Sequence, residues 1–266
     1  MSDGMHRVEC AAADLAAGKT VVLVGYGSQG SDGYLVVAAE KATTHDVAFM
    51  VRHTAGFVCA AVTDEICARA GLPLLSGTFP ASGHDFTVSV DAASGVTTGI
   101  SAADRAATVR RLADPASDPT DFTRPGHVVP VLVHSNGVLG RRRAAEAAVD
   151  LLRAAGLHEA GALAALVSDT EPTGIAGPAQ SRAFAAEHRM NWVSIADIVN
   201  YRRSAEPLAR QTFRVVHDTP YGAIEEIGYP SDTSDVDLRA YRAAEVARIL
   251  RLANVTERTA TNRHPA

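Results

Sequence analysis

The hydrophobic residues follow helical spacing in some segments of the chain and strand-like spacing in others. Val8, Ala11 and Leu15 recur at helical spacing, and Gly18 follows where a helix can end. Short aliphatic runs bounded by polar or glycine-rich sequence predict strands. The predicted helices cover residues 6–17, 44–52, 63–70, 101–113, 143–155, 181–189 and 196–203, and the predicted strands cover residues 20–24, 56–62, 85–91, 127–133, 162–167 and 192–195. This alternation around one sheet predicts an α+β fold, an α/β sandwich.

The pattern changes after Ser204. Residues 212–232 indicate two strands joined at a Pro-Tyr-Gly turn, and residues 237–253 indicate a long helix that precedes a polar tail. We therefore expect one domain over residues 1–204 and a C-terminal extension over residues 205–266. Residues 114–126, rich in proline, aspartate and serine, are expected to form a surface loop within the first domain.

Composition narrows the range of partners. The chain is 47% hydrophobic and 21% charged, with a formal net charge of −5, which argues against nucleic-acid binding. No apolar run approaches the ~20 residues that a membrane span needs. The N-terminus lacks the basic head and apolar run of a signal peptide. The three cysteines form no CxxC pair, so we expect a cytoplasmic protein with neither a membrane nor a nucleic-acid partner.

A glycine-rich segment follows the first predicted strand. Gly25, Gly27 and Gly30 satisfy the spacing G-x-G-x-x-G, which lets backbone amides approach a dinucleotide pyrophosphate. However, Asp32 and Gly33 stand where the following helix should begin. The second strand with its acidic residue about 20 positions further on is also missing. A dinucleotide site is therefore the less favoured interpretation of this segment.

Several longer motifs occur in order along the first domain. They are GVTTGISAADR at residues 95–105, RPGHVVPV at 124–131, EAAVDLLRAAGL at 146–157 and IADIVNYR at 195–202. Together they resemble the 3,4-dihydroxy-2-butanone 4-phosphate synthases of riboflavin biosynthesis, and the resemblance extends over residues 8–203. It implies a homodimer with its active site near the interface. It also implies a magnesium-dependent rearrangement of ribulose 5-phosphate that releases formate.

The chain departs from that family where metal and acid–base groups are expected. By the resemblance, the metal-binding glutamate falls on Gly30 and the metal-binding histidine on Ala144. The substrate-contacting arginine falls on Gln29, the aspartate on Tyr34 and the threonine on Ala145. A late catalytic glutamate falls on Ala165. Alanine neither binds a metal nor moves a proton, and acid–base help alone supplies about 10²–10⁴-fold in rate. We therefore expect no metal or cofactor, and loss of the parent reaction.

The surviving polar residues suggest a different chemistry. Three successive arginines suit an anionic ligand, because the guanidinium fork matches phosphate and carboxylate. We expect a repurposed, metal-independent enzyme, lyase-, isomerase- or cyclase-like, acting on an anionic small molecule in a specialised biosynthetic pathway. The candidate catalytic residues are His127, Tyr34 and Glu146, and the candidate ligand-binding residues are Arg141, Arg142, Arg143, Tyr26, Gln29, Asp32, Cys59 and Thr98.

Two alternatives stay open. Arg142 and Arg143 are equally compatible with plain solvent exposure at a helix start, and a lone histidine such as His127 is more often structural. The whole chain is also compatible with a non-catalytic protein that binds a metabolite or pairs with an active synthase.

The C-terminal extension carries a resemblance of its own. Residues 214–232 are similar to the opening strands of GTP cyclohydrolase II, which is often fused behind the synthase. No cysteine follows Cys67, so the zinc ligands of the cyclohydrolase are missing. We interpret the extension as a truncated remnant of a two-domain chain.

Overall fold

The computed structural model describes residues 3–25, 32–75, 85–171, 174–205, 213–219, 222–229 and 238–242. The chain divides into two compact units, Met1–Ala205 and Glu206–Ala266. The expected boundary after Ser204 lies one residue from this division.

A mixed eight-stranded sheet forms the centre of the first unit. Its strands are β1 (Val21–Val24), β2 (Gly33–Ala38), β3 (Cys59–Val62), β4 (Asp85–Phe86), β5 (Val90–Ala92), β6 (Phe122–Leu132), β7 (Ala160–Ala165) and β8 (Trp192–Ser194). Seven of them follow the order β4-β6-β3-β7-β2-β1-β8, and β5 also pairs with β6. The β3/β6 and β1/β8 pairs are parallel, whereas the other pairs are antiparallel.

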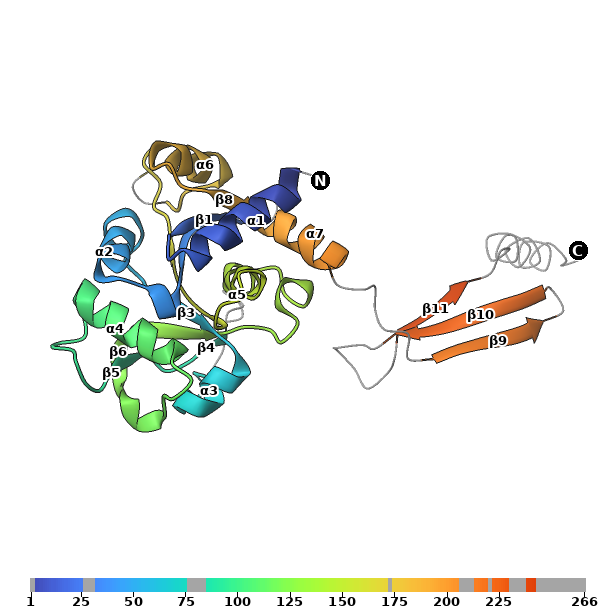
Figure 1. The fold of residues 1–266 in the computed structure, drawn as a ribbon, viewed down its shortest axis with the longest axis horizontal. Helices are drawn as coiled ribbons and strands as arrows, with labels where there is room; N and C mark the ends of the chain where they lie inside the picture. Colours follow the sequence, from blue (N-terminus) through green and yellow to red (C-terminus); the bar gives the residue numbers. More distant parts are fainter. Residues whose placement is uncertain are drawn as a thin grey trace, which may run out of the picture. The chain divides into compact units, whose positions relative to one another are not determined.

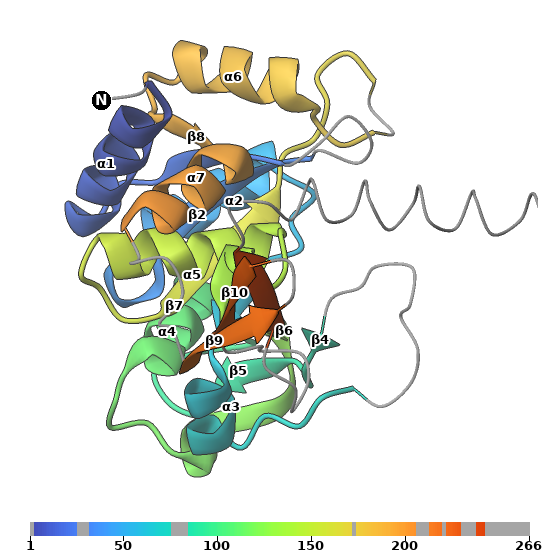
Figure 2. The same cartoon turned by 90° about the vertical axis from the view of Figure 1, so that its right-hand side faces the viewer.

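Helices cover both faces of this sheet. They are α1 (Asp3–Ala16), α2 (Thr44–His53), α3 (Asp64–Ala70), α4 (Ala102–Ala113), α5 (Ala144–Ala154), α6 (Pro178–Glu187) and α7 (Ile195–Ala205). Figure 1 shows α2 and α4 on one side of the strands and α1, α5 and α7 on the other. In Figure 2, α6 and α1 lie toward one end of the unit and α3 toward the other. The prediction of an α+β sandwich is confirmed.

Alternating side-chain directions along each strand explain why the sheet has a hydrophobic core on each of its two faces. Val22 and Val24 of β1 pack into the core that contains Leu112 of α4. Val21 and Leu23 pack into the opposite core, which contains Leu151 of α5. Successive side chains of a strand point to opposite faces, so a strand that is apolar throughout serves two cores at once.

The helix ends follow the chemistry of their cap residues. Thr43 forms a capping box with Asp46 at the start of α2, and the Ser101 hydroxyl accepts a hydrogen bond from the Asp104 N–H at the start of α4. Gly71 ends α3 with φ of 61°, a left-handed conformation that glycine tolerates best. The expected starts of α2 and α4 are thereby confirmed.

Four details differ from expectation. Strand β2 was not predicted, and it pairs antiparallel with β1 as a hairpin. A dinucleotide site needs a helix after the first strand and its loop, so that interpretation of the glycine-rich segment is wrong. The expected single strand over residues 85–91 is divided into β4 and β5. The end of the expected loop, residues 122–126, belongs to β6 because it pairs with β5. Residues 238–242 form a strand where a helix was expected.

The second unit contains a three-stranded antiparallel sheet. Its strands β9 (Phe213–Thr219), β10 (Gly222–Tyr229) and β11 (Leu238–Arg242) follow the order β11-β10-β9. The hairpin of β9 and β10 confirms the two predicted strands. The rest of the expected terminal helix lies outside the described residues. None of the described helices combines the length and apolarity that crossing a bilayer requires.

Candidate functional site

Three positions singled out by the motifs meet at one cavity of about 190 Å³. Tyr34 on β2 lies directly opposite Ala165 on β7 in the antiparallel register. Ala144, the first residue of α5, lines the same cavity. Sheet pairing and a helix start therefore bring together residues that lie more than 100 positions apart in sequence.

The lining of this cavity is mostly apolar. The candidate ligand-binding residue Cys59 belongs to it, as does Ala145, and Phe57, Phe86, Val131 and Leu163 contribute apolar side chains. Phe57 and Phe86 contact each other edge to face, with ring centroids 6.1 Å apart. The sequence analysis did not identify these two rings, because their contact depends on strand pairing.

Burial keeps the two ionisable groups of the lining in their neutral forms. Burial, with Asp32 nearby, raises the pKa of Tyr34 to about 12. Burial alone raises the pKa of Cys59 to about 12. At neutral pH the phenol therefore donates a hydrogen bond and the thiol is un-ionised.

Asp32 lies beside the phenol of Tyr34. The two side-chain oxygens are 3.5 Å apart, which is long for a hydrogen bond. Burial raises the pKa of Asp32, although the contact with Tyr34 works in the opposite direction. Two further candidates from the same loop, Tyr26 and Gln29, lie outside the described residues.

Arg141 and Glu146 form a second cluster next to the start of α5. Arg141 donates from Nε to Glu146 Oε1 at 2.6 Å and from Nη1 to Asp85 Oδ2 at 2.7 Å, and its Nη2 reaches the Leu132 carbonyl at 2.9 Å. Glu146 is fully buried and also accepts from the His134 N–H at 3.1 Å. Arg141 thereby ties strands β4 and β6 to α5, and neither Arg141 nor Glu146 lines the cavity.

The neighbouring arginines lie at the same helix start. Arg143 is the N-cap residue of α5, and its side chain forms no capping hydrogen bond. Its charge acts on Tyr34 and works to lower the pKa of that phenol, so the two side chains are near each other. Arg142 is exposed.

His127 belongs to a third cluster. Its Nδ1 lies 2.7 Å from Asp91 Oδ2, and its backbone N–H donates to Asp91 Oδ1 at 2.9 Å. Gly99, with φ of 85°, lies so close that an added Cβ would collide with the Asp91 carboxylate. Thr98 is exposed in the same bend. Asp91 was missed by the sequence analysis, although it lies only four residues before the motif at residues 95–105.

The structure thus brings Tyr34, Cys59 and Asp32 together but keeps His127 apart from them. His127 lies on β6 two residues before Val129, which pairs with Cys59 of β3. His127 is not among the residues that line the cavity.

A metal ion does not fit the described part of this site. Within those residues no three histidine, cysteine, aspartate or glutamate side chains come together as ligands. Ala144 and Ala165 occupy the positions where the motifs would place a histidine and a glutamate, and a methyl group offers no lone pair.

Comparison with known proteins places the chain in a family. The model of the family "3,4-dihydroxy-2-butanone 4-phosphate synthase" matches residues 9–201. The chain belongs to this family. Curated relatives include the riboflavin biosynthesis protein RibBA of Mycobacterium tuberculosis and that of Mycobacterium marinum, each 44% identical over 244 residues, which is 91% of this chain. The chain spans only 57% of the length of each of these relatives.

Solved structures agree with this assignment. The two-domain synthase RibBX from A. baumannii is 32% identical, with a TM-score of 0.82 over 90% of this chain and 70% of its own. A synthase of Candida albicans is 34% identical, with a TM-score of 0.67 over 73% of this chain and 96% of its own. A synthase in complex with two magnesium ions is 33% identical, with a TM-score of 0.69 over 73% of this chain and 95% of its own.

These findings correct the functional expectation. A repurposed enzyme of specialised metabolism, lyase-like or otherwise diverged, was expected, with a non-catalytic protein as the alternative. Both are wrong, as is the expectation that the chain is not an active synthase. Relatives that are 44% identical over most of the chain are named for riboflavin biosynthesis, and the family and structural matches point to the synthase function.

Proposed function

We propose that this chain forms 3,4-dihydroxy-2-butanone 4-phosphate from ribulose 5-phosphate, the reaction of its family, within riboflavin biosynthesis. The observation that carries this proposal is the family match over residues 9–201, together with 44% identity to the RibBA proteins. The cavity at Tyr34, Ala144 and Ala165 is the proposed substrate site, because the motif positions converge there.

His127 is the proposed proton-transfer group. Enolisation of a ketose requires a base at the carbon beside the carbonyl, and histidine is the commonest such base. Asp91 accepts from Nδ1 at 2.7 Å, which fixes the ring and leaves Nε2 to take the proton. The His127 side chain is 39% exposed, so a substrate can reach it.

Tyr34 is the proposed hydrogen-bond donor to the carbonyl oxygen. Its pKa of about 12 keeps the phenol protonated, and its burial strengthens a hydrogen bond to developing negative charge. Arg143, whose charge acts on Tyr34, is the proposed contact for the phosphate, with Arg142, Thr98 and Cys59 as further contacts.

Arg141 and Glu146 are assigned a positioning role. Glu146 is fully buried and faces Arg141, so its carboxylate orders the wall of the site. Arg141 donates hydrogen bonds to Glu146, Asp85 and the Leu132 carbonyl, which are all protein groups. Tyr26, Gln29 and Asp32 remain proposed ligand contacts on the glycine-rich segment.

The chain is proposed to act as a homodimer in the cytoplasm. His127 does not line the cavity of its own chain, and an active site near a dimer interface would bring it to the cavity of a second copy. Phe57, Leu74 and Leu75 are about half exposed near this cavity, and a second copy would bury them. The second unit is proposed to be similar to the opening strands of GTP cyclohydrolase II.

The turnover rate of this chain with ribulose 5-phosphate is expected to be low. Ala144 and Ala165 supply no acid–base group, and one such group contributes about 10²–10⁴-fold. We therefore expect turnover slower than that of the synthase RibBX by a factor of that order.

The test is formate release from ribulose 5-phosphate by the full chain, measured with and without magnesium, with RibBX as positive control. Slow formation of formate and the four-carbon phosphate in equal amounts supports the proposal. Formate production no faster than in buffer, while RibBX turns over, would refute it.

A mixing experiment tests the shared site. His127→Asn and Tyr34→Phe are each expected to abolish activity as homodimers. When the two variants are unfolded and refolded together, half of the dimers are mixed and each contains one intact site, so about a quarter of the activity should return. Failure of the mixture to recover activity, with mixed dimers shown by mass spectrometry, would exclude the shared site while leaving the reaction itself standing.

A further inference from the structure

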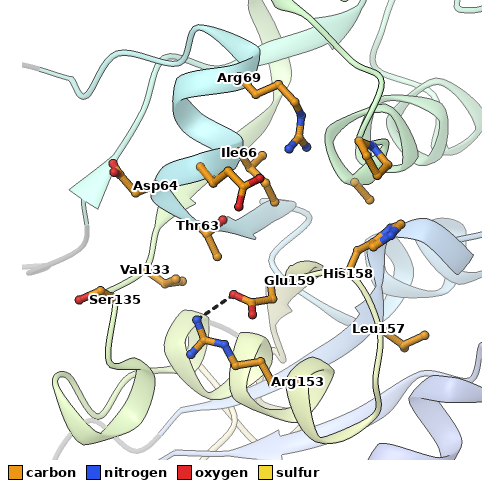
Figure 3. Close-up of a pocket in the computed structure, with 13 residues that line it drawn as sticks. Thr63, Asp64, Ile66, Arg69, Val133, Ser135, Arg153, Leu157, His158 and Glu159 are labelled. Carbon is orange, nitrogen blue, oxygen red and sulfur yellow. Dashed lines mark hydrogen bonds and ion pairs between the residues drawn. The ribbon is translucent and has the colours of Figure 1, made fainter.

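A second pocket, of about 470 Å³, lies away from the cavity described above (Figure 3). Arg69 of α3 reaches into it from one wall, and Arg153 of α5 and Glu159 face it from the other. None of the motif-derived candidate residues lines this pocket. Its volume falls within the range of about 300–1,000 Å³ that is usual for small-molecule sites.

The floor of this pocket is the carboxyl end of the parallel pair β3 and β6. Thr63 follows β3 directly and Val133 follows β6, and the Val133 N–H donates to the Val62 carbonyl at 3.0 Å. Ligands in open α/β sheets characteristically bind outside the carboxyl ends of parallel strands. The position in the fold therefore favours a binding site independently of the side chains.

Arg69 carries a charge without an anionic partner among the described residues. Its Nε lies 3.4 Å from Ser117 Oγ and its Nη2 lies 3.3 Å from the Leu112 carbonyl, and both partners are neutral. No carboxylate of the described chain lies within 4.0 Å of it. A half-buried guanidinium in this state favours a carboxylate or phosphate.

On the pocket wall opposite Arg69, the charge of Arg153 is already paired within the protein. Arg153 donates to Asp150 at 3.0 Å and to Glu159 at 2.7 Å, so its charge is matched within the protein. Glu65 and Asp64 also line the pocket and form no ion pair within the described part of the chain. The charges left over are thus one cation and two anions, and a ligand that is only anionic would face excess negative charge.

We propose that this pocket binds a small zwitterion. Its anionic group pairs with Arg69 and its ammonium group lies toward Glu65 and Asp64. Glu65 and Arg69 stand one helical turn apart on α3, about 5–6 Å between their Cβ atoms, and yet they do not pair with each other. A ligand with a short spacer between its charges matches this separation. The hydroxyls of Thr63 and Ser135 line the same pocket.

Calorimetry with the full chain tests the proposal through three probes of equal chain length. γ-Aminobutyrate carries both charges, butyrate carries only the anion, and butylamine carries only the cation. We expect γ-aminobutyrate to bind at least tenfold more tightly than either single-charge probe. Butyrate or butylamine binding as tightly as γ-aminobutyrate would overturn the zwitterion assignment, and so would the absence of binding by γ-aminobutyrate.

Variants locate the site. Arg69→Met is expected to weaken γ-aminobutyrate binding at least tenfold, and Glu65→Gln to weaken it severalfold. Arg52→Met, on the exposed end of α2, is the matched control and should leave binding unchanged. Binding that survives Arg69→Met, with the circular dichroism of the variant unaltered, would overturn the proposal. Since formate release is measured separately, this result is independent of the proposed reaction.

Discussion

Replacing Arg141 with methionine removes the cation that lies between two carboxylates. Glu146 is fully buried and receives the Arg141 Nε–H at 2.6 Å, while Asp85 receives the Nη1–H at 2.7 Å. In the variant the Glu146 carboxylate keeps only the His134 N–H, because its Oε2 has no hydrogen-bond partner among the described residues. The result is a buried, nearly unpaired charge.

Breaking a buried ion pair from one side costs about 3–5 kcal/mol. The Arg141 side chain is 21% exposed, so water reaches part of the pair, and the remaining contact to His134 also compensates. We therefore take the lower limit, about 3 kcal/mol, as the expected loss of unfolding free energy. For a unit of this size that corresponds to a fall in Tm of roughly 6–12 °C.

The assay is urea unfolding of the full chain followed by tryptophan fluorescence. Trp192 is the single tryptophan of the sequence and lies in β8, so its signal reports the first unit. The double variant Arg141→Met with Glu146→Leu should recover most of the loss, because it removes both buried charges. Lys19→Met, which breaks the exposed pair with Asp14, is the control and should cause no resolvable change.

Two outcomes would refute the reasoning. Arg141→Met with unchanged stability would mean that water already solvates Glu146. A double variant that is less stable than the single one would mean that packing around the side chains, and not the unpaired charge, determines the loss.

Three shorter predictions follow from the same structure. Burial raises the pKa of Asp197, but hydrogen bonds from Arg7 and Ser194 outweigh it, so the folded pKa is lowered. The Asp197 carboxylate therefore contributes to the free energy of unfolding above its ordinary pKa of 3.8, and this contribution is lost as the pH falls below that value. In Asp197→Asn, the free energy of unfolding should fall less steeply with decreasing pH in this acid range. Gly99→Ala should lower Tm and abolish turnover, because its Cβ collides with Asp91; normal turnover would contradict this. Cys59 should react with a thiol reagent at pH 8 only after unfolding, since its pKa is about 12.

The sequence pattern predicted most elements of the first unit but missed β2. Residues 33–38, GYLVVA, follow a glycine-rich segment and are buried on both faces of the sheet. A strand buried on both faces has no polar alternation, so periodicity does not separate it from a short buried helix or a loop. The prediction of a helix from residue 237 was wrong for a different reason. Residues 238–242 pair with β10, and this strand pairing overrides the local helix propensity.

The motifs singled out positions that share a cavity, but they did not indicate contacts that depend on the fold. Tyr34, Ala144 and Ala165 were singled out by alignment with known motifs, and they meet at one cavity. The pair of Asp85 with Arg141 joins residues 56 positions apart, and no local pattern indicates it. The pocket at Arg69 was likewise not predicted, because its lining is assembled from segments that are far apart in the sequence.

The wrong functional expectation came from inferring loss of the reaction from the substituted positions alone. Tyr34, Ala144 and Ala165 line a single cavity, the proposed substrate site, so they would act on one reacting centre. Groups that act as a unit are strongly non-additive: removing one member costs nearly as much rate as removing them all. The deficit is then close to that of a single group, about 10²–10⁴-fold, and does not multiply to the point of abolishing the reaction. By the same reasoning, Ala144→His or Ala165→Glu alone should restore little activity, because neither position functions without the other.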